Sequence, residues 1–350
     1  MARIVLADDG IEFDGRTPDE RPLGGAESSV VALVEELAAR GHDVHVLNKC
    51  PAPLDHKGVR WRPIGAPGAK GVIPDNVDLY IANRGDKLIG LIPKARRHVF
   101  WIHNPARYLM KWRYLSKLWR VRPVVVFIGD YHATTYPAWA LDGGRAVIPY
   151  GIHDAFCQAE PLEKPPGRRA VFTSNPLRSL DWLLDVWGRD IRPQVPGAEL
   201  HVFAGAATYG SVGARKENVM NAVLRRAESM ADAGVRLRGP VPKAALIGEL
   251  RASRAMLYRG DLEETFCLAV GEAQAMGVPA VVENFGSVSE RVIDGETGFV
   301  AADDAAFADC ARRLLTDDAL WRTQHLAALA KQRNWRWADA AAAFERLILQ

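Results

Sequence analysis

The sequence has few of the features that mark membrane-spanning, disulfide-bonded or zinc-binding proteins. None of its apolar runs approaches the roughly 20 residues that a membrane-spanning helix needs. Its 350 residues include only four cysteines, and none forms a CxxC pair or a Cys/His cluster with zinc spacing. A net charge of +3 is too small to indicate nucleic-acid binding. We therefore expect free thiols, a reducing compartment and no nucleic-acid partner.

Two common nucleotide-binding motifs are also missing. The absence of GxGxxG and GxxxxGK[ST] argues against NAD dehydrogenases and P-loop NTPases. The N-terminal residues MARIVLADDG do not have the pattern of a signal peptide, because acids follow a short apolar run at once. We expect a cytoplasmic protein and leave open a peripheral position on the inner face of the membrane.

Short apolar runs alternate with helical patterns along the whole chain. Continuous β-branched runs are typical of strands buried on both faces of a parallel sheet, so the predicted fold class is α/β. A helix is predicted over 26–40, followed by Gly41 as its C-cap. The predicted strands cover 3–7, 44–48, 77–82, 98–102, 124–128 and 146–149, then 170–174, 199–204, 235–239, 255–258, 279–283 and 298–301.

The segment EPLEKPPGRR (160–169) is rich in proline and charge, which predicts a linker between two α/β halves. We expect a first domain over 1–155 and a second over 165–335, with a ligand cleft at the carboxyl ends of the strands. The last helix, 336–350, has one apolar face and is predicted to pack back on the first domain.

A glycine loop, LGGAE (23–27), directly precedes the first long helix. Gly24 and Gly25 allow backbone N–H groups to approach a ligand closely, and the helix N-terminus offers free donors and partial positive charge. The loop suits a phosphate, but an ordinary glycine turn has the same pattern. We interpret Asp8, Asp9, Asp303 and Asp304 as loop acids rather than as a metal site.

Three motifs in this order resemble the retaining family 4 glycosyltransferases. They are the glycine loop, VIPYGIHDAF (147–156) and EETFCLAVGEAQAMGVPAVV (263–282). The resemblance covers nearly the whole chain and implies the GT-B fold, in which two Rossmann-like domains face each other across a cleft. It differs from the family at Tyr150, where asparagine is usual, and at Cys267, where glycine is common.

The resemblance also implies roles in binding a nucleotide sugar. The acids of the E-x7-E motif are Glu264, expected at the transferred sugar, and Glu272, expected at the ribose. Backbone groups around Phe266, Cys267 and Leu268 are expected near the sugar or the phosphates.

Arg178 matches the second of two basic residues that many members place on the pyrophosphate, whereas Thr173 or a neighbour stands at the first. Either Lys243 or Arg259 supplies the missing charge, or Ser174, Asn175 and backbone donors hold the pyrophosphate.

The spacing of Glu264 and Glu272 argues against a glycosidase pair. Eight residues of helix rise about 12 Å, whereas glycosidase carboxyls lie about 5–5.5 Å or about 6.5–9.5 Å apart. Two surface glutamates would be the ordinary alternative.

Cys267 has no neighbouring base in the sequence, so we interpret it as a small structural side chain rather than a nucleophile. His103 ends a predicted strand, and the resemblance implies a contact to the sugar or the acceptor rather than a general-base role.

Residues 107–122 hold six basic and no acidic residues. At 100° per residue, Tyr108, Trp112, Leu115 and Trp119 share one face of a helix, and Arg113, Lys117 and Arg120 lie opposite. Either the aromatic face packs in the core, or the helix meets an anionic membrane or a phosphorylated acceptor.

We expect a retaining, metal-independent hexosyltransferase without a cofactor. It would transfer a sugar from a nucleoside-diphosphate sugar to a glycan, a lipid-linked or a small-molecule acceptor. The alternatives are a nucleotide-sugar-binding or scaffold protein without turnover, and a GT-B epimerase or phosphorylase.

Overall fold

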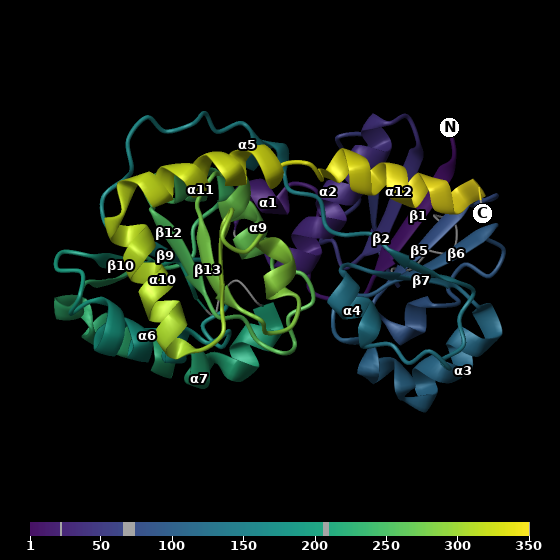
Figure 1. Cartoon of the computed structure of the whole chain (residues 1–350). Helices are drawn as coiled ribbons and strands as arrows, with labels where there is room; N and C mark the ends of the chain where they lie inside the picture. Colours follow the sequence, from purple (N-terminus) through teal and green to yellow (C-terminus); the bar gives the residue numbers. More distant parts are fainter. Residues whose placement is uncertain (22, 66–73, 206–209, 350) are drawn as a thin grey trace. The chain divides into compact units, whose positions relative to one another are not determined.

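The computed structural model describes residues 1–21, 23–65, 74–205 and 210–349, with only the backbone described for 210–215. The chain divides into two units. Unit 1 consists of Met1–Glu20, Gly25–Gly151 and Arg336–Gln350, and unit 2 of Arg21–Gly24 and Ile152–Trp335. Each unit is an α/β body built around its own sheet (Figure 1).

The sheet of unit 1 has eight strands in the order β3-β4-β2-β1-β5-β6-β7-β8. Its pairings are parallel except for the antiparallel edge pair β3–β4. The inner strands are apolar and buried, as expected for strands that helices cover on both faces. The strands are β1 (Arg3–Asp8), β2 (Asp43–Asn48), β3 (Leu54–His56), β4 (Val59–Pro63), β5 (Leu79–Asn83), β6 (Arg97–Trp101), β7 (Val124–Phe127) and β8 (Arg145–Val147).

The last helix, α12 (Trp337–Leu349), belongs to unit 1 and packs against α2 (Gly25–Ala39) (Figure 1). Its buried face includes Phe344, whose ring meets the buried Trp101 of β6 edge to face. Gln350, the last residue of the predicted helix, lies outside the described residues. The shorter helices of unit 1 are α1 (Thr17–Glu20), η2 (Asp86–Leu88), η3 (Ala106–Met110), α3 (Trp112–Val121) and α4 (Asp130–Thr134).

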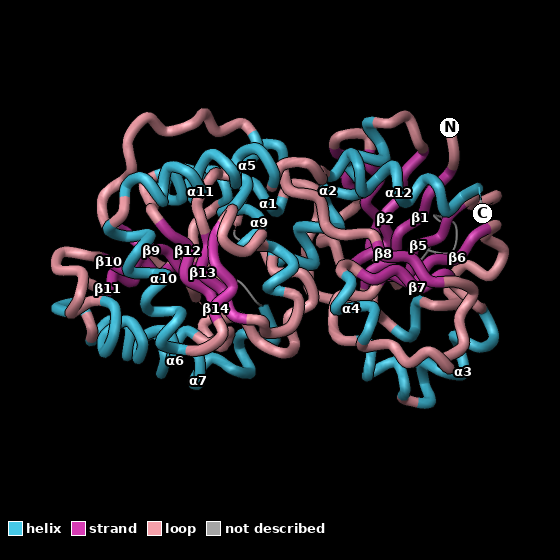
Figure 2. Tube along the Cα trace, in the orientation of Figure 1, coloured by secondary structure: helices cyan, strands magenta, loops and turns pink. Residues whose placement is uncertain are grey.

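The sheet of unit 2 has six strands in the order β11-β10-β9-β12-β13-β14, drawn in magenta in Figure 2. The described pairings are parallel. In chain order the strand order is 3-2-1-4-5-6, the order of a Rossmann-type sheet, whose ligands bind where the order reverses. The strands are β9 (Arg169–Phe172), β10 (Glu199–Val202), β11 (Val235–Leu237), β12 (Ala255–Tyr258), β13 (Ala280–Glu283) and β14 (Gly298–Ala301).

The helices of unit 2 pack on a core that includes the buried Trp187 and Leu184. They are α5 (Asp154–Cys157), α6 (Leu180–Val186), the π-helix η4 (Trp187–Ile191), α7 (Gly210–Ser229), η6 (Ala231–Ala233), α8 (Lys243–Arg251), α9 (Leu268–Ala275), η7 (Val288–Arg291), α10 (Asp304–Thr316) and α11 (Asp318–Lys331).

The proline-rich segment 160–169 is not the boundary between the units. It belongs to unit 2, to which backbone groups of Glu160, Leu162 and Glu163 are tied by hydrogen bonds from or to side chains of that unit. The change of unit falls instead at Gly151, within the motif VIPYGIHDAF. A Cβ atom there would lie 2.2 Å from the backbone nitrogen of Trp337, so glycine is required for the close approach of two chain segments.

The prediction of one amphipathic helix over 107–122 is wrong. Residues Ala106–Met110 form a 3-10 turn, Lys111 is extended, and α3 begins only at Trp112. The buried residues of α3 are Tyr114 and Leu118, whereas Trp112 is 76% and Trp119 60% exposed. The expectation that the aromatic face packs in the core therefore fails for both tryptophans.

Candidate functional site

The sheet order of unit 2 reverses between β9 and β12, which are neighbouring parallel strands. The loops that follow these strands carry Ser174, Asn175 and Arg178 on one side and Asp261 and Glu264 on the other. Since the carboxyl ends of parallel strands meet at one edge of a sheet, side chains far apart in the sequence come together there.

Arg178 and Glu264 form the centre of this cluster. The Arg178 Nη1 atom lies 3.3 Å from both Glu264 Oε2 and Asp261 Oδ1. The Tyr258 hydroxyl donates to Glu264 Oε2 at 2.7 Å, and Ser174 Oγ lies 3.2 Å from the same hydroxyl. Burial lowers the pKa of the Arg178 guanidinium, but Glu264 and other anionic groups outweigh this effect and raise the pKa overall. Arg178 therefore stays charged beside the carboxylate.

The loop between Glu264 and α9 makes a tight turn. Cys267 precedes the helix with a φ of 65°, in the left-handed region that glycine adopts most readily. Gly286 approaches the same loop so closely that a Cβ atom would lie 2.6 Å from the Glu264 carbonyl oxygen. Phe266 is buried beneath the guanidinium of Arg291, 4.4 Å from its ring centre. The turn brings the N-terminus of α9, at Leu268, next to Glu264.

The thiol of Cys267 is not poised for nucleophilic chemistry. Cys267 is 4% exposed, and burial together with the charge of Glu264 raises the pKa of its thiol well above the ordinary value. Because the thiolate is the reactive form, this environment keeps the sulfur inert.

Glu272 lies in α9 and is 6% exposed. Its Oε1 atom accepts a hydrogen bond at 2.5 Å from Lys243 Nζ, at the first residue of α8. The two glutamates thus have different partners, Arg178 and Tyr258 for Glu264 and Lys243 for Glu272. Of the two proposed replacements for the missing basic residue, Lys243 lies beside the motif, whereas Arg259 pairs with Glu283 and stacks between Trp182 and Phe285.

The other predicted donor-site residues lie in loops or at helix starts. Asn175 Oδ1 accepts from the Leu177 backbone nitrogen at 2.9 Å, which fixes the turn that leads to Arg178. Gly25 is the first residue of α2, and Gly24 lies in the preceding loop. Gly24 is grouped with unit 2 and Gly25 with unit 1.

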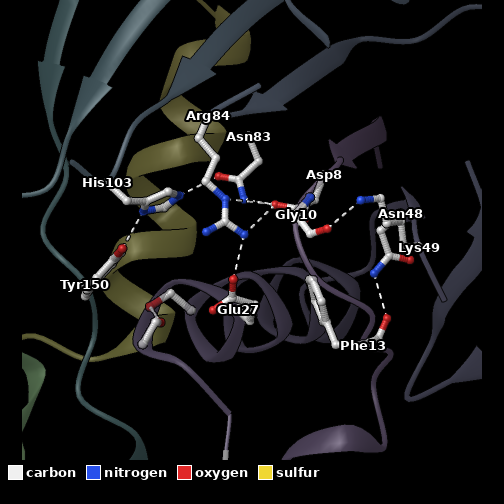
Figure 3. A network of polar contacts seen from close by, with 12 residues as sticks. Asp8, Gly10, Phe13, Glu27, Asn48, Lys49, Asn83, Arg84, His103 and Tyr150 are labelled. Atoms are coloured by element: carbon white, nitrogen blue, oxygen red, sulfur yellow. Dashed lines mark hydrogen bonds and ion pairs between the residues drawn. The ribbon is translucent and has the colours of Figure 1, made fainter. Parts of the chain in front are cut away.

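Unit 1 carries a second polar cluster, where its own sheet order reverses between β1 and β5 (Figure 3). Asp8, the last residue of β1, is fully buried. Arg84 Nη2 lies 3.0 Å from Asp8 Oδ2 and 2.7 Å from Glu27 Oε1 in α2. Asn83, the last residue of β5, donates to Asp8 Oδ2 at 2.5 Å. The interpretation of Asp8 as a loop acid is therefore wrong.

His103 joins this network from the carboxyl end of β6. Its Nε2 atom lies 2.5 Å from Asn83 Oδ1, and its Nδ1 atom bonds to the Tyr150 hydroxyl (Figure 3). Since the Asn83 amide nitrogen points to Asp8, His103 Nε2 must donate and Nδ1 must accept from tyrosine. Burial and the charge of Arg84 lower the pKa of His103 well below its ordinary value. The ring is neutral, and its contact to a sugar or an acceptor stays a prediction.

Sequence reasoning missed the roles of Arg84, Asn83 and Glu27. The available signal was the position of Asp8 and Asn83, which end buried strands at the same edge of the sheet. Tyr150 was noticed as a departure from the family, and its hydroxyl links the end of unit 1 to His103.

The second unit matches a known sequence family. Residues 168–317 match the family described as Glycosyl transferases group 1. The match covers less than half of the chain and falls within unit 2. The match agrees with the resemblance drawn from Glu264, Glu272 and the residues between them.

Curated relatives match over parts of the chain. A D-inositol 3-phosphate glycosyltransferase from Corynebacterium diphtheriae is 34% identical over 113 residues, which is 32% of this chain and 26% of the relative. A glycogen synthase from Mycobacterium tuberculosis is 28% identical over 221 residues, or 61% of this chain and 43% of the relative. The chain thus spans less than half the length of these curated relatives.

Solved structures match over nearly the whole chain. A sucrose-phosphate synthase from Thermosynechococcus elongatus superposes with a TM-score of 0.78 at 17% identity, covering 99% of this chain and 98% of that one. Anabaena HepE, solved with UDP and glucose, has a TM-score of 0.72 at 16% identity, with 99% of each chain covered. These likenesses show that the chain has the GT-B fold.

The described residues contain neither a metal-ion cluster nor a membrane-spanning helix. No group of three or more His, Cys, Asp or Glu side chains in them is arranged to hold a metal ion. Within the same ranges, no helix is both long and apolar enough to cross a bilayer.

Proposed function

We propose that the protein is a retaining glycosyltransferase that moves a hexose from a nucleoside-diphosphate sugar to an acceptor hydroxyl. The observation that carries this proposal is the pairing of Arg178 with Glu264, at the reversal point of a sheet in the part of the chain that matches the Glycosyl transferases group 1 family. Lys243 and Glu272 extend the same region along α9. A region with two cations, each beside its own carboxylate, suits a ligand that has both phosphates and hydroxyl groups.

The donor would be bound by groups with distinct tasks. Glu272 would accept hydrogen bonds from the ribose hydroxyls, which requires Lys243 to give up or share its contact. Arg178 and the backbone N–H groups at the start of α9 would face the pyrophosphate, where a helix N-terminus favours an anion. Glu264, held by Arg178 and Tyr258, would contact the transferred sugar.

The chemistry would proceed on one face of the sugar. The bond between the anomeric carbon and the leaving phosphate oxygen breaks, and a bond to the acceptor oxygen forms on the same side. The acceptor proton passes to the leaving phosphate, so neither a protein nucleophile nor a general base is needed. Arg178 would stabilise the charge that develops on the leaving group, without a metal ion or cofactor.

A second candidate is a protein that binds nucleotide sugars without turnover. The observation that favours it is that the positive charge of Arg178 is already paired with the carboxylates of Asp261 and Glu264. Such an arrangement leaves less positive potential for a departing pyrophosphate than two free basic residues would.

The test is incubation of the protein with UDP, GDP and ADP sugars. UDP sugars come first, because the structurally similar HepE was solved with UDP-glucose. We expect release of one nucleoside diphosphate, stimulated by an acceptor, and a product whose NMR coupling shows the anomeric configuration of the donor. Stabilisation by a nucleotide sugar without release would favour the binding protein, and inversion would contradict the proposed mechanism.

A further inference from the structure

Unit 1 exposes large apolar side chains at both ends of α3 and on a loop that reaches its C-terminal end. Trp112 is 76% and Trp119 60% exposed on the helix itself. Trp139 is 70% and Leu141 50% exposed on the loop before β8. This loop reaches the C-terminal end of α3, since the Gly143 backbone nitrogen donates to the Pro123 carbonyl oxygen at 2.9 Å. Exposed apolar side chains gathered in this way mark an interaction site.

The geometry of α3 places its two tryptophans on the same side. They are seven residues apart, which brings their side chains within about 20° of each other around the helix axis. The opposite side is anchored in the core of unit 1 by Tyr114 and the fully buried Leu118. The helix therefore cannot rotate to hide the indoles, and we call the exposed side, with Trp112 and Trp119, the tryptophan face.

The surroundings of the tryptophan face are strongly basic. Arg107, Lys111, Arg113, Arg120 and Arg122 are all exposed. Asp86 forms ion pairs with this segment: Lys117 Nζ lies 2.7 Å and Arg113 Nε 3.9 Å from its carboxylate.

The Arg120 guanidinium points back over the segment before β6, within 3.9 Å of the position of a Cβ atom on Gly90. The segment thus combines exposed indoles with an excess of positive charge.

We propose that the tryptophan face docks the protein on an anionic membrane surface. Indole rings favour the boundary between water and acyl chains, and arginine and lysine beside them are attracted to anionic headgroups. A helix that lies in the interface with aromatic residues on its apolar side and basic residues at its flanks has this composition. The proposal concerns a surface of unit 1 and does not depend on the donor site of unit 2.

The leucine side chains beside the tryptophan face and the spacing of its two indoles favour a membrane over a nucleic acid as the partner. Bases stack on flat aromatic platforms, whereas Leu115 on α3 and Leu141 on the loop add apolar surface that is not planar. The two tryptophans are also separated by two helical turns, about 10 Å, rather than by the stacking distance of neighbouring bases.

The test is co-sedimentation of the whole protein with vesicles of phosphatidylcholine that contain phosphatidylglycerol, against vesicles of phosphatidylcholine alone. We expect binding to the anionic vesicles that weakens with added salt. The double variant Trp112→Ala/Trp119→Ala should weaken it by about tenfold or more, because both side chains are mostly exposed in the free protein. The double variant Arg113→Ala/Arg120→Ala should weaken it by about fivefold for each charge.

Matched controls remove comparable groups from unit 2. Lys216→Ala/Arg225→Ala removes two exposed charges on α7, and Val219→Ala/Leu326→Ala trims two exposed apolar side chains. Both controls should bind as the wild type does, and circular dichroism should show all variants folded. Absence of binding to anionic vesicles, or equal binding by the tryptophan variant, overturns the proposal. Retention of a single-stranded RNA homopolymer with no vesicle binding overturns it in favour of a nucleic-acid partner.

Discussion

The two units place polar clusters at equivalent points of their sheets, yet the clusters differ in how their charges are held. In unit 1, Arg84 bridges Asp8 and Glu27, and the Asp8 side chain is fully buried. In unit 2 the acids are less deeply buried, with 15% of the Glu264 side chain and 8% of the Glu272 side chain accessible. The Arg178 side chain is about as exposed as that of Arg84, 28% against 23%, and the Lys243 side chain is more exposed, at 39%. A charge pair that is partly open to solvent can exchange its partner for a ligand, whereas a pair with a fully buried acid fixes the backbone around it.

This difference assigns different tasks to similar edges of two similar sheets. The unit 1 cluster orients Asn83 and thereby the neutral ring of His103. The unit 2 cluster holds Glu264 and Glu272 apart, each beside its own cation.

The largest effect on stability is expected from Asp8→Asn. This change removes one partner of a buried ion pair, which typically costs about 3–5 kcal/mol. Unfolding by urea, followed through hydrogen exchange of the β1 and β5 amides, measures the loss. Asp9→Asn is the matched control: burial and neighbouring Asp8 raise the pKa of the Asp9 carboxyl, so a neutral side chain should be tolerated there. Equal losses in the two variants would contradict a special role for Asp8.

Acid should weaken unit 1 through His132. This side chain accepts from the Ile128 backbone nitrogen at 3.2 Å and contacts the Asn104 carbonyl oxygen at 2.8 Å. Burial lowers the pKa of His132 from 6.5 to about 4. The unfolded chain therefore takes up a proton at a higher pH than the folded chain does. The resulting stability is fully present above pH 6.5 and is lost as the pH falls through 4, for a total of about 3 kcal/mol.

Hydrogen exchange of β7 amides between neutral and acidic pH measures this loss. In the variant His132→Gln, the slope of stability against pH in this part of unit 1 should become shallower. An unchanged slope in that variant would show that other groups, and not His132, cause the acid sensitivity.

A smaller loss is expected from Gly151→Ala. A Cβ atom would lie 2.2 Å from the Trp337 backbone nitrogen. Overpacking of this kind typically lowers the free energy of unfolding by about 1–3 kcal/mol. Calorimetry should show a lower melting temperature. Gly167→Ala, where nothing lies within 4 Å of the added atom, should melt with the wild type. If both alanines are tolerated, the close approach at Gly151 is not essential.

The smallest effect is expected from Cys267→Gly. Glycine relieves a left-handed backbone that strains other residues by about 1 kcal/mol or more, and this gain offsets the loss of a small buried side chain. The activity and melting temperature of this variant should stay near those of the wild type. In the folded wild type, iodoacetamide should leave Cys267 unmodified. Loss of turnover in the glycine variant, with donor binding intact, would indicate that the thiol takes part in the reaction.

Most strands could be predicted because their apolar runs are continuous, and a run such as 298–301 coincides with β14. The strand β4 and the edge strand β3 beside it were missed, since VRWRP and LDH mix charged and apolar residues. The prediction of one helix over 107–122 was wrong because a helical wheel assumes an unbroken helix. Lys111 is extended, so the residues before and after it do not share one helix axis.

The part of the candidate site that lies within one sequence motif could be predicted. Glu264 and Glu272 stand eight residues apart in a single stretch, so their different surroundings could be expected from helix geometry. The Lys243–Glu272 contact joins residues 29 positions apart, and the Asp8–Asn83 contact joins residues 75 positions apart. Such pairs depend on strand order, which spacing in the sequence does not reveal.

The most direct test compares Glu264→Gln with Glu272→Gln in two assays, calorimetric binding of the nucleoside diphosphate and turnover of its sugar. Glu272→Gln should weaken nucleotide binding by about tenfold or more, because it removes a charged acceptor for the ribose hydroxyls. Glu264→Gln should leave nucleotide binding within about threefold of the wild type, yet lower turnover by about 100-fold or more. Identical profiles for the two variants, or full activity in both, would contradict the division of tasks between these two acids.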